Sequence, residues 1–167
     1  MSMEKSTLYL KKVINSNLYD EQWIKLSNFM FLWILFEKYI LSANSSENGI
    51  SSKIAMISSA PNISFIHTYD KIKDWYFPTA KSDVVFRCFR GGWAKKLKEI
   101  VKNTIEAETN ATDTHKLITT VAIIYKYRCN LFHGTKELDK ILPVQGEKLD
   151  SFNEFLINYL KSKNIGI

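Results

Sequence analysis

Apolar residues recur at helical spacing over several long segments, and this periodicity constrains the fold more than any other feature of the sequence. The last such segment places Leu149, Phe152, Leu156 and Leu160 three or four residues apart, which is the spacing of one face of a helix. Only 6 Gly and 3 Pro interrupt the 167 residues, so turn-rich β folds and disordered chains are disfavoured. The sequence therefore predicts an all-α protein.

The predicted helices are separated by short polar segments or by segments that contain Gly or Pro. They cover approximately residues 4–15, 20–43, 54–57, 64–76, 93–109, 114–132 and 147–161. The Ser/Asn/Gly-rich stretch 42–53 is predicted to be a loop, and a second loop is expected around Pro143 and Gly146. We expect an up-and-down helical bundle of four main helices plus short extra helices, forming a single domain over residues 1–167.

No membrane segment or cofactor site is expected. The longest apolar run, residues 29–36, is much shorter than the roughly 20 residues that cross a bilayer, and no export signal is recognised, so we expect a cytoplasmic protein. Cys88 and Cys129 are far apart in the sequence, and no His, Cys, Asp or Glu residues have the spacing of metal ligands. His67 and His115 are therefore interpreted as ordinary surface or boundary residues.

Positive charge is concentrated in one part of the chain. The net charge is +6, and residues 71–102 alone contain nine basic and three acidic residues, with aromatic residues between them. This pattern suits a polyanion such as RNA, and the predicted RNA-binding residues are Arg87, Arg90, Lys95, Lys96 and Lys98. The alternative is a solvated helical face with core aromatic residues behind it, and the sequence leaves both interpretations open.

One arginine interrupts an apolar row on the predicted helix 114–132. The row consists of Leu117, Val121, Ile124, Arg128 and Leu131. A guanidinium in such a row must snorkel, form a pair, or face a cleft or a partner, because an unpaired buried charge is very costly.

A histidine follows this arginine by five residues. On an ideal helix this spacing separates Arg128 and His133 by about 140°, so the two side chains converge only if the helix ends there. Gly134 is expected to provide that ending.

These residues resemble the signature of a known family. The segment Tyr125–Gly134 reads YKYRCNLFHG and is similar to the R-x4-H motif of the HEPN superfamily, in the variant that ends in Leu-Phe-His-Gly. The segment Trp33–Tyr39 reads WILFEKY and resembles the W-x2-F-E pattern of several prokaryotic HEPN branches. The two segments cover two helices, and the rest of the chain agrees with the family in size and helicity.

The resemblance implies an all-α bundle that dimerises with its Arg/His motifs facing each other. It also implies a metal-independent endoribonuclease, acting in a toxin–antitoxin pair or in phage defence, with RNA and an antitoxin or defence-system protein as partners. Arg128 and His133 match the two motif residues. The position after the arginine is usually Asn, Asp or His in the family, whereas this chain has Cys129 there and Asn130 one place later. A non-catalytic HEPN-like module that binds RNA, a nucleotide or a protein partner therefore stays open.

The chemistry follows from the residue types. RNA supplies its own nucleophile, the 2′-hydroxyl, so cleavage requires a group that moves protons and a cation that stabilises the phosphate. Histidine suits the first role and arginine the second, and a dimer would place two histidines at one site. Glu37 lies on the otherwise apolar row that contains Trp33, so it is expected either to pair with Arg128 across the bundle or to reach solvent.

Overall fold

A computed structural model describes residues 20–42, 47–58, 65–76, 93–107, 110–132 and 138–166. Within these residues all regular structure is helical, and the predicted all-α class is confirmed. In chain order the elements are α2 (Asp20–Phe36), the π-helical turn η1 (Glu37–Leu41), α3 (Glu47–Ile54), α4 (Ile66–Tyr76), α6 (Lys95–Glu106), α7 (Asp113–Phe132) and α8 (Leu138–Ser162).

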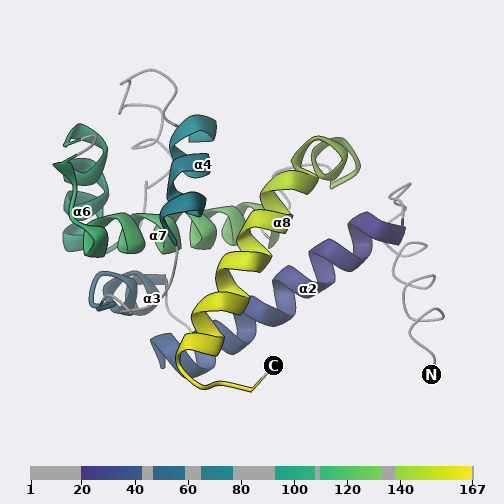
Figure 1. Cartoon of the computed structure of the whole chain (residues 1–167), viewed down its shortest axis with the longest axis horizontal. Coiled ribbons are helices and arrows are strands. Elements are labelled where there is room, and N and C mark those ends of the chain that lie inside the picture. Colours follow the sequence, from purple (N-terminus) through teal and green to yellow (C-terminus); the bar gives the residue numbers. More distant parts are fainter. Residues whose placement is uncertain are drawn as a thin grey trace.

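Helices α2 and α8 lie side by side and run in the same direction, and α7 passes behind α8 in the view of Figure 1. The contacts show the shared direction, because Lys25 meets Asp150 near the start of the pair and Phe36 meets Tyr159 near its end. Helices α4 and α6 pack on α7, and α3 lies between η1, α6 and α7. None of the described helices has both the length and the apolar character needed to span a membrane.

Helix α7 forms the centre of the bundle. Every residue from Leu117 to Tyr125 is buried, so this stretch is covered on all sides rather than along one face. Thr119 and Thr120 share this burial, and the hydroxyl of Thr120 donates a hydrogen bond to the carbonyl oxygen of Lys116 at 2.9 Å.

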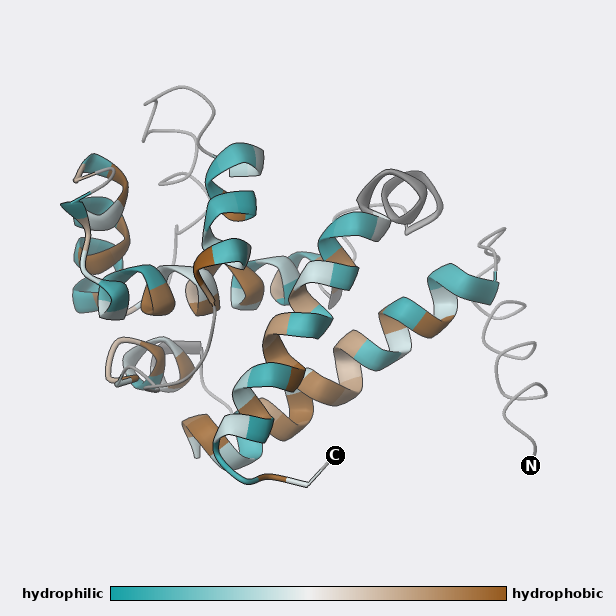
Figure 2. Ribbon diagram, viewed as in Figure 1, coloured by the Kyte–Doolittle hydropathy of each residue, from teal (hydrophilic) through white to brown (hydrophobic). Residues whose placement is uncertain are grey.

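Aromatic rings connect α7 to the α2–α8 pair. The ring centroid of Tyr127 lies 5.7 Å from that of Phe29 and 5.2 Å from that of Phe152, both in edge-to-face geometry. Such pairs contribute roughly 0.5–1.5 kcal/mol each beyond their burial. Figure 2 shows hydrophobic residues gathered where the later parts of α2 and α8 lie together, and this is where Phe36 meets Tyr159.

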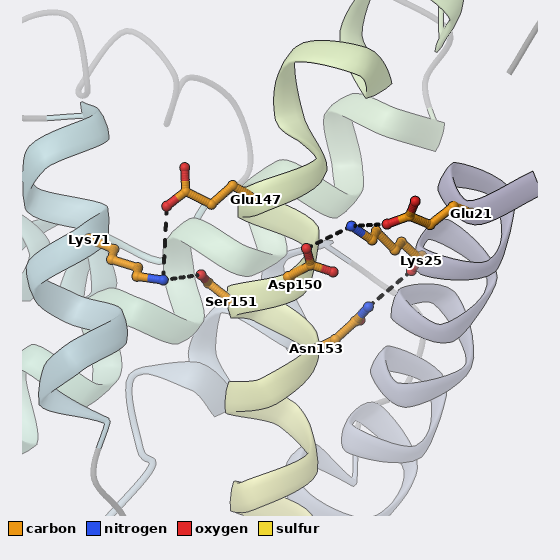
Figure 3. A network of polar contacts seen from close by, with 7 residues as sticks. All are labelled: Glu21, Lys25, Lys71, Glu147, Asp150, Ser151 and Asn153. Carbon is orange, nitrogen blue, oxygen red and sulfur yellow. Dashed lines mark hydrogen bonds and ion pairs between the residues drawn. The ribbon is translucent and has the colours of Figure 1, made fainter. Parts of the chain in front are cut away.

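Polar contacts near the middle of α8 connect it to α2 (Figure 3). Lys25 Nζ lies 2.8 Å from Asp150 Oδ2 and 2.9 Å from Glu21 Oε1, and its hydrogen bond with Asp150 raises the pKa of Lys25. Asn153 Nδ2 donates a hydrogen bond to the carbonyl oxygen of Lys25 at 3.0 Å. These contacts fix the register of the two helices.

On the other side of α8, Lys71 of α4 makes polar contacts with α8 (Figure 3). Lys71 Nζ donates a hydrogen bond to Ser151 Oγ at 3.1 Å and lies 3.9 Å from Glu147 Oε1. The first lysine of the predicted basic segment therefore takes part in helix packing.

The predicted loop at residues 42–53 is wrong over most of its length, because Glu47–Ile54 is helix α3. Ile50 and Ile54 are buried at helical spacing. Ser51, although polar, is also buried, and its Oγ accepts a hydrogen bond from the backbone N–H of Ala94 at 2.9 Å. The tertiary contact compensates for the weak helix propensity of these residues. The predicted short helix at 54–57 is instead the end of α3 and the turn that follows it.

The second predicted loop is also wrong, because α8 begins at Leu138 and continues through Pro143 and Gly146. A proline costs one backbone hydrogen bond, but it lies early in a helix of 25 residues whose later turns are anchored by a buried face. The predictions for α4, α6 and α7 agree with the structure within three residues. The predicted helix at 4–15 lies outside the described residues, and so does Gly134, which was predicted to end the helix at 114–132.

Candidate functional site

The segment of α7 that carries Arg128 is the part where the helix leaves the core. After Tyr125 burial alternates, with Lys126, Arg128, Asn130 and Leu131 half-buried and Tyr127 and Cys129 buried. On a helix with about 100° per residue, the two buried side chains lie on nearly opposite faces. This segment is therefore covered on two sides and accessible on the other two.

Arg128 interrupts an apolar row, as the sequence predicts. Leu117, Val121 and Ile124 are completely buried, whereas Arg128, one turn further along, is half-buried. The guanidinium therefore has access to solvent from the open side of α7.

Asn130 does not share the face of Arg128. Two residues along an α-helix separate side chains by about 160°, so Asn130 lies on the same face as Lys126, on the opposite open side of α7. Within one chain the helix does not bring Arg128 and Asn130 together.

Cys129 is directed into the core. Its side chain is buried, and burial raises the pKa of the thiol, while interactions with Tyr125, Arg128 and Lys126 oppose this rise. A neutral buried thiol is a small hydrophobic group with weak hydrogen-bonding capacity. Cys129 therefore packs as a core residue, and its thiol also interacts with the side chains of Tyr125 and Arg128.

The two motif-bearing segments are in direct contact. Trp33 stacks on Tyr125 with 5.6 Å between ring centroids and on Phe36 at 5.5 Å. Trp33 thus packs the W-x2-F-E segment against α7, while Phe36 packs against Trp33 and against Tyr159 of α8. The sequence did not indicate this contact, because aromatic residues on two separate helices carry no signal that pairs them.

Glu37 begins the π-helical turn η1 and is half-buried. Its Oε1 atom is buried and has no hydrogen-bond partner. The predicted pair with Arg128 is therefore not made through this oxygen, and the same oxygen does not reach solvent. Such an unsatisfied buried oxygen lowers stability by about 1–3 kcal/mol or more.

His133, Arg87 and Arg90 lie outside the described residues. The roles assigned to them from the sequence stay predictions.

The described part of the basic segment consists mainly of α4 and α6. The exposed face of α6 alternates in charge, because Lys95 lies 3.9 Å from Glu99 and Lys102 lies 3.7 Å from Glu106. Lys96 is exposed and Lys98 is half-buried. Exposed ion pairs of this kind contribute little to stability, but they lower the net positive charge that α6 presents.

The described aromatic residues of the basic segment, Trp75, Tyr76 and Trp93, pack in or against the core. Trp93 is buried, with its ring centroid 5.1 Å from that of Tyr125. Trp75 packs edge-on against Phe152 at 6.1 Å, and Lys148 Nζ lies 5.5 Å from the centroid of its ring. Within the described residues, Trp75 and Trp93 therefore contribute to packing, and both interpretations of the basic segment stay open.

Helix α2 carries an exposed apolar stripe whose residues are not among the predicted site residues. Ile24, Phe31 and Ile34 are 53%, 58% and 57% exposed and lie on one face of the helix. We refer to these three residues as the α2 stripe. Its signal in the sequence is the crowded run 29–36, which is apolar around the whole helix, so one face is left over after the core is packed.

Metal chemistry has no candidate ligands in the described part of the chain, where no group of three or more His, Cys, Asp or Glu residues is close enough to hold an ion. His67 is exposed and His115 half-buried, as expected for surface and boundary residues. No protein-family model, curated protein or solved structure matches this chain.

Proposed function

We propose that this protein is a metal-independent endoribonuclease of the HEPN type, which cleaves RNA at a site formed by Arg128 and His133. The observation that carries the proposal is the position of Arg128, which is half-buried in an apolar row at the point where α7 emerges from the core. The guanidinium keeps its charge at all physiological pH values, and its planar fork matches the oxygens of a phosphate. The motif resemblance supplies His133 as the second group.

In this mechanism Arg128 binds the scissile phosphate and stabilises the charge that develops on its oxygens. His133 removes the proton from the 2′-hydroxyl, and the oxygen attacks the adjacent phosphorus. The bond to the 5′-oxygen breaks, and a second protonated histidine donates a proton to that leaving oxygen. The products end in a 2′,3′-cyclic phosphate and a 5′-hydroxyl.

A second histidine requires a second chain, so the proposal includes a homodimer. The α2 stripe supports it, because three large apolar side chains on one exposed helix face suit an interface between proteins. The proposed setting is the cytoplasm, in a toxin–antitoxin pair or a phage-defence system with a partner protein that controls activity.

The proposal is tested by incubating purified protein with RNA in excess EDTA and analysing the ends of the products. We expect cleavage with cyclic-phosphate ends, loss of cleavage in Arg128→Ala, and an unchanged circular dichroism spectrum. Lys126→Ala, a half-buried cation on the other face of α7, is the matched control and should retain activity. Products with 5′-phosphate ends, or activity that depends on magnesium, would exclude the Arg/His mechanism.

A second candidate is a non-catalytic module with the same fold, and the burial of Cys129 favours it. The family places a polar residue after the motif arginine, whereas here that position packs into the core. If the wild type binds RNA as a dimer but does not cut any RNA tested, the non-catalytic module is the correct function. Cys129→Asn then tests whether a polar group at this position restores cleavage.

A further inference from the structure

A second candidate site lies at the end of the bundle where η1, the end of α3 and the C-terminal end of α8 meet. The cavity there has a volume of about 490 Å³, and its lining residues come from three segments: residues 39–42, Lys53 with residues 56–58, and Tyr159 with Lys163 and Ile165. Pockets of roughly 300–1,000 Å³ are typical of small-molecule sites. Arg128 is not among its lining residues, so this cavity is distinct from the proposed ribonuclease site.

Two lysines give the cavity a positive charge. Lys53 and Lys163 both line it, and no described carboxylate forms an ion pair with either of them. Lys163 Nζ lies 5.8 Å from the centre of the Tyr159 ring. The described lining contains no acidic residue. Two ammonium groups match the charge of a phosphate monoester, which is about −1.5 to −2 at pH 7, better than the single charge of a carboxylate.

The remaining walls are apolar or aromatic. Ile40, Ile57 and Ile165 contribute aliphatic surface, and Tyr39 and Met56 stand at the rim with 49% and 70% of their surfaces exposed. Thioether and aromatic groups pack well against flat rings. A free phosphate ion would leave these walls uncovered, so the cavity suits an anion that carries a flat, partly apolar body.

Backbone conformation marks the same place. The two non-glycine residues with positive φ in the described chain are Ser42, at 45°, and Asn164, at 58°. Ser42 lines the cavity directly after the π-helical turn, and Asn164 stands between two lining residues. Asn commonly adopts this backbone conformation directly after a helix, as Asn164 does after α8, but for Ser42 it is less favourable, and π-helical turns are frequent at functional sites. Both irregularities flank one cavity.

We propose that this cavity binds a small phosphate monoester with a flat, partly apolar body, the class to which nucleoside monophosphates belong. Lys53 and Lys163 bind the phosphate as point charges. Tyr39 and Met56 cover the body at the rim. The proposal does not depend on ribonuclease activity, and either function can fail without affecting the other.

The first experiment is isothermal titration calorimetry of the full chain with adenosine 5′-monophosphate, adenosine and inorganic phosphate. We expect the monophosphate to bind at least about tenfold more tightly than either part alone, because the charged and apolar contacts act together. No detectable binding of the monophosphate would overturn the proposal. Equal affinity for adenosine would exclude the lysines as anchors, and equal affinity for inorganic phosphate would exclude the apolar walls.

Variants then locate the site. Lys53→Gln combined with Lys163→Gln should weaken monophosphate binding by at least about tenfold, since hydrogen bonds to charged groups contribute strongly. The matched control, Lys73→Gln combined with Lys161→Gln, removes the same charge outside the cavity and should leave the affinity unchanged. Equal weakening by both pairs would show a non-specific charge effect and would refute the site.

A third variant guards against structural effects of the lysine changes. Met56→Asp places a negative charge at a rim position that is 70% exposed, so the fold should tolerate it. We expect this variant to abolish monophosphate binding while its far-ultraviolet circular dichroism stays unchanged. Undiminished binding in a folded Met56→Asp protein would place the ligand elsewhere and contradict the proposal.

Discussion

Replacing Tyr127 with phenylalanine should make the protein more stable. The side chain is 6% exposed, and its hydroxyl is buried without a hydrogen-bond partner in the structure. Burial also raises the pKa of Tyr127 far above its usual value, with a smaller contribution from Tyr76. Tyr127→Phe retains the ring contacts with Phe29 and Phe152 and removes the unsatisfied group.

The magnitude follows from the cost of that group. An unsatisfied buried hydroxyl lowers the free energy of unfolding by about 1–3 kcal/mol, and the small void that its removal leaves cancels part of the gain. We therefore expect Tyr127→Phe to raise the free energy of unfolding by about 1–2 kcal/mol. For a chain of this size the melting temperature should rise by about 2–8 °C.

The assay is urea unfolding followed by circular dichroism at one fixed protein concentration, because dimerisation would also shift the midpoint. Tyr125→Phe is the matched control, since Tyr125 is equally buried but interacts with Cys129. It should lower stability by about 0.5–1.5 kcal/mol. If Tyr127→Phe instead destabilises the protein by 1 kcal/mol or more, its hydroxyl forms a bond and the packing of α7 described above is incorrect.

Three further predictions concern the dimer, the basic segment and alkaline pH. Phe31→Glu, at a position 58% exposed, should raise the dissociation constant of the dimer at least about tenfold, measured by analytical ultracentrifugation, whereas the control Asn103→Glu on α6 should not change it. A monomeric wild type would exclude the dimer. Changing Lys95, Lys96 and Lys98 of α6 to Gln should weaken RNA binding. The slope of log affinity against log salt concentration should fall by about 0.7 per lost phosphate contact, and an unchanged slope would show that α6 is only a solvated face. Burial raises the pKa of Tyr69, Cys129, Tyr127 and Tyr159, so the folded state retains their protons more strongly than the unfolded chain does. Their contribution to stability should be complete below about pH 7.5 and should be lost as pH rises through the ordinary titration range of thiols and phenols. Equal stability at pH 8 and pH 11 would contradict this.

Periodicity predicted the helices that have one clear apolar face. Helix α6 is the simplest case, because Leu97, Ile100, Val101 and Thr104 form its buried face and charged residues cover the rest. Helix α3 was missed because its buried positions include Ser51, which is held by the backbone of Ala94. A polar residue that is buried through a tertiary hydrogen bond looks like a loop residue in the sequence.

The candidate site was predicted in part for a similar reason. Arg128 was identified because a charged residue in an apolar row can be recognised from the sequence of a single helix. The directions of Cys129 and Asn130 depend on which neighbours cover α7, and the environment of Glu37 depends on a π-helical turn that has no sequence signal. The lysine-lined cavity combines residues from three distant segments, and no local pattern connects them.

The central claim is that His133 and Arg128 cleave RNA without a metal. The most direct measurement is the cleavage rate of an RNA pool in EDTA by wild-type protein and by His133→Ala, prepared and assayed side by side. We expect cleavage by the wild type and a loss of about 100-fold or more in the variant, with both proteins folded and equally dimeric. Equal cleavage by the two proteins would contradict the proposed role of His133.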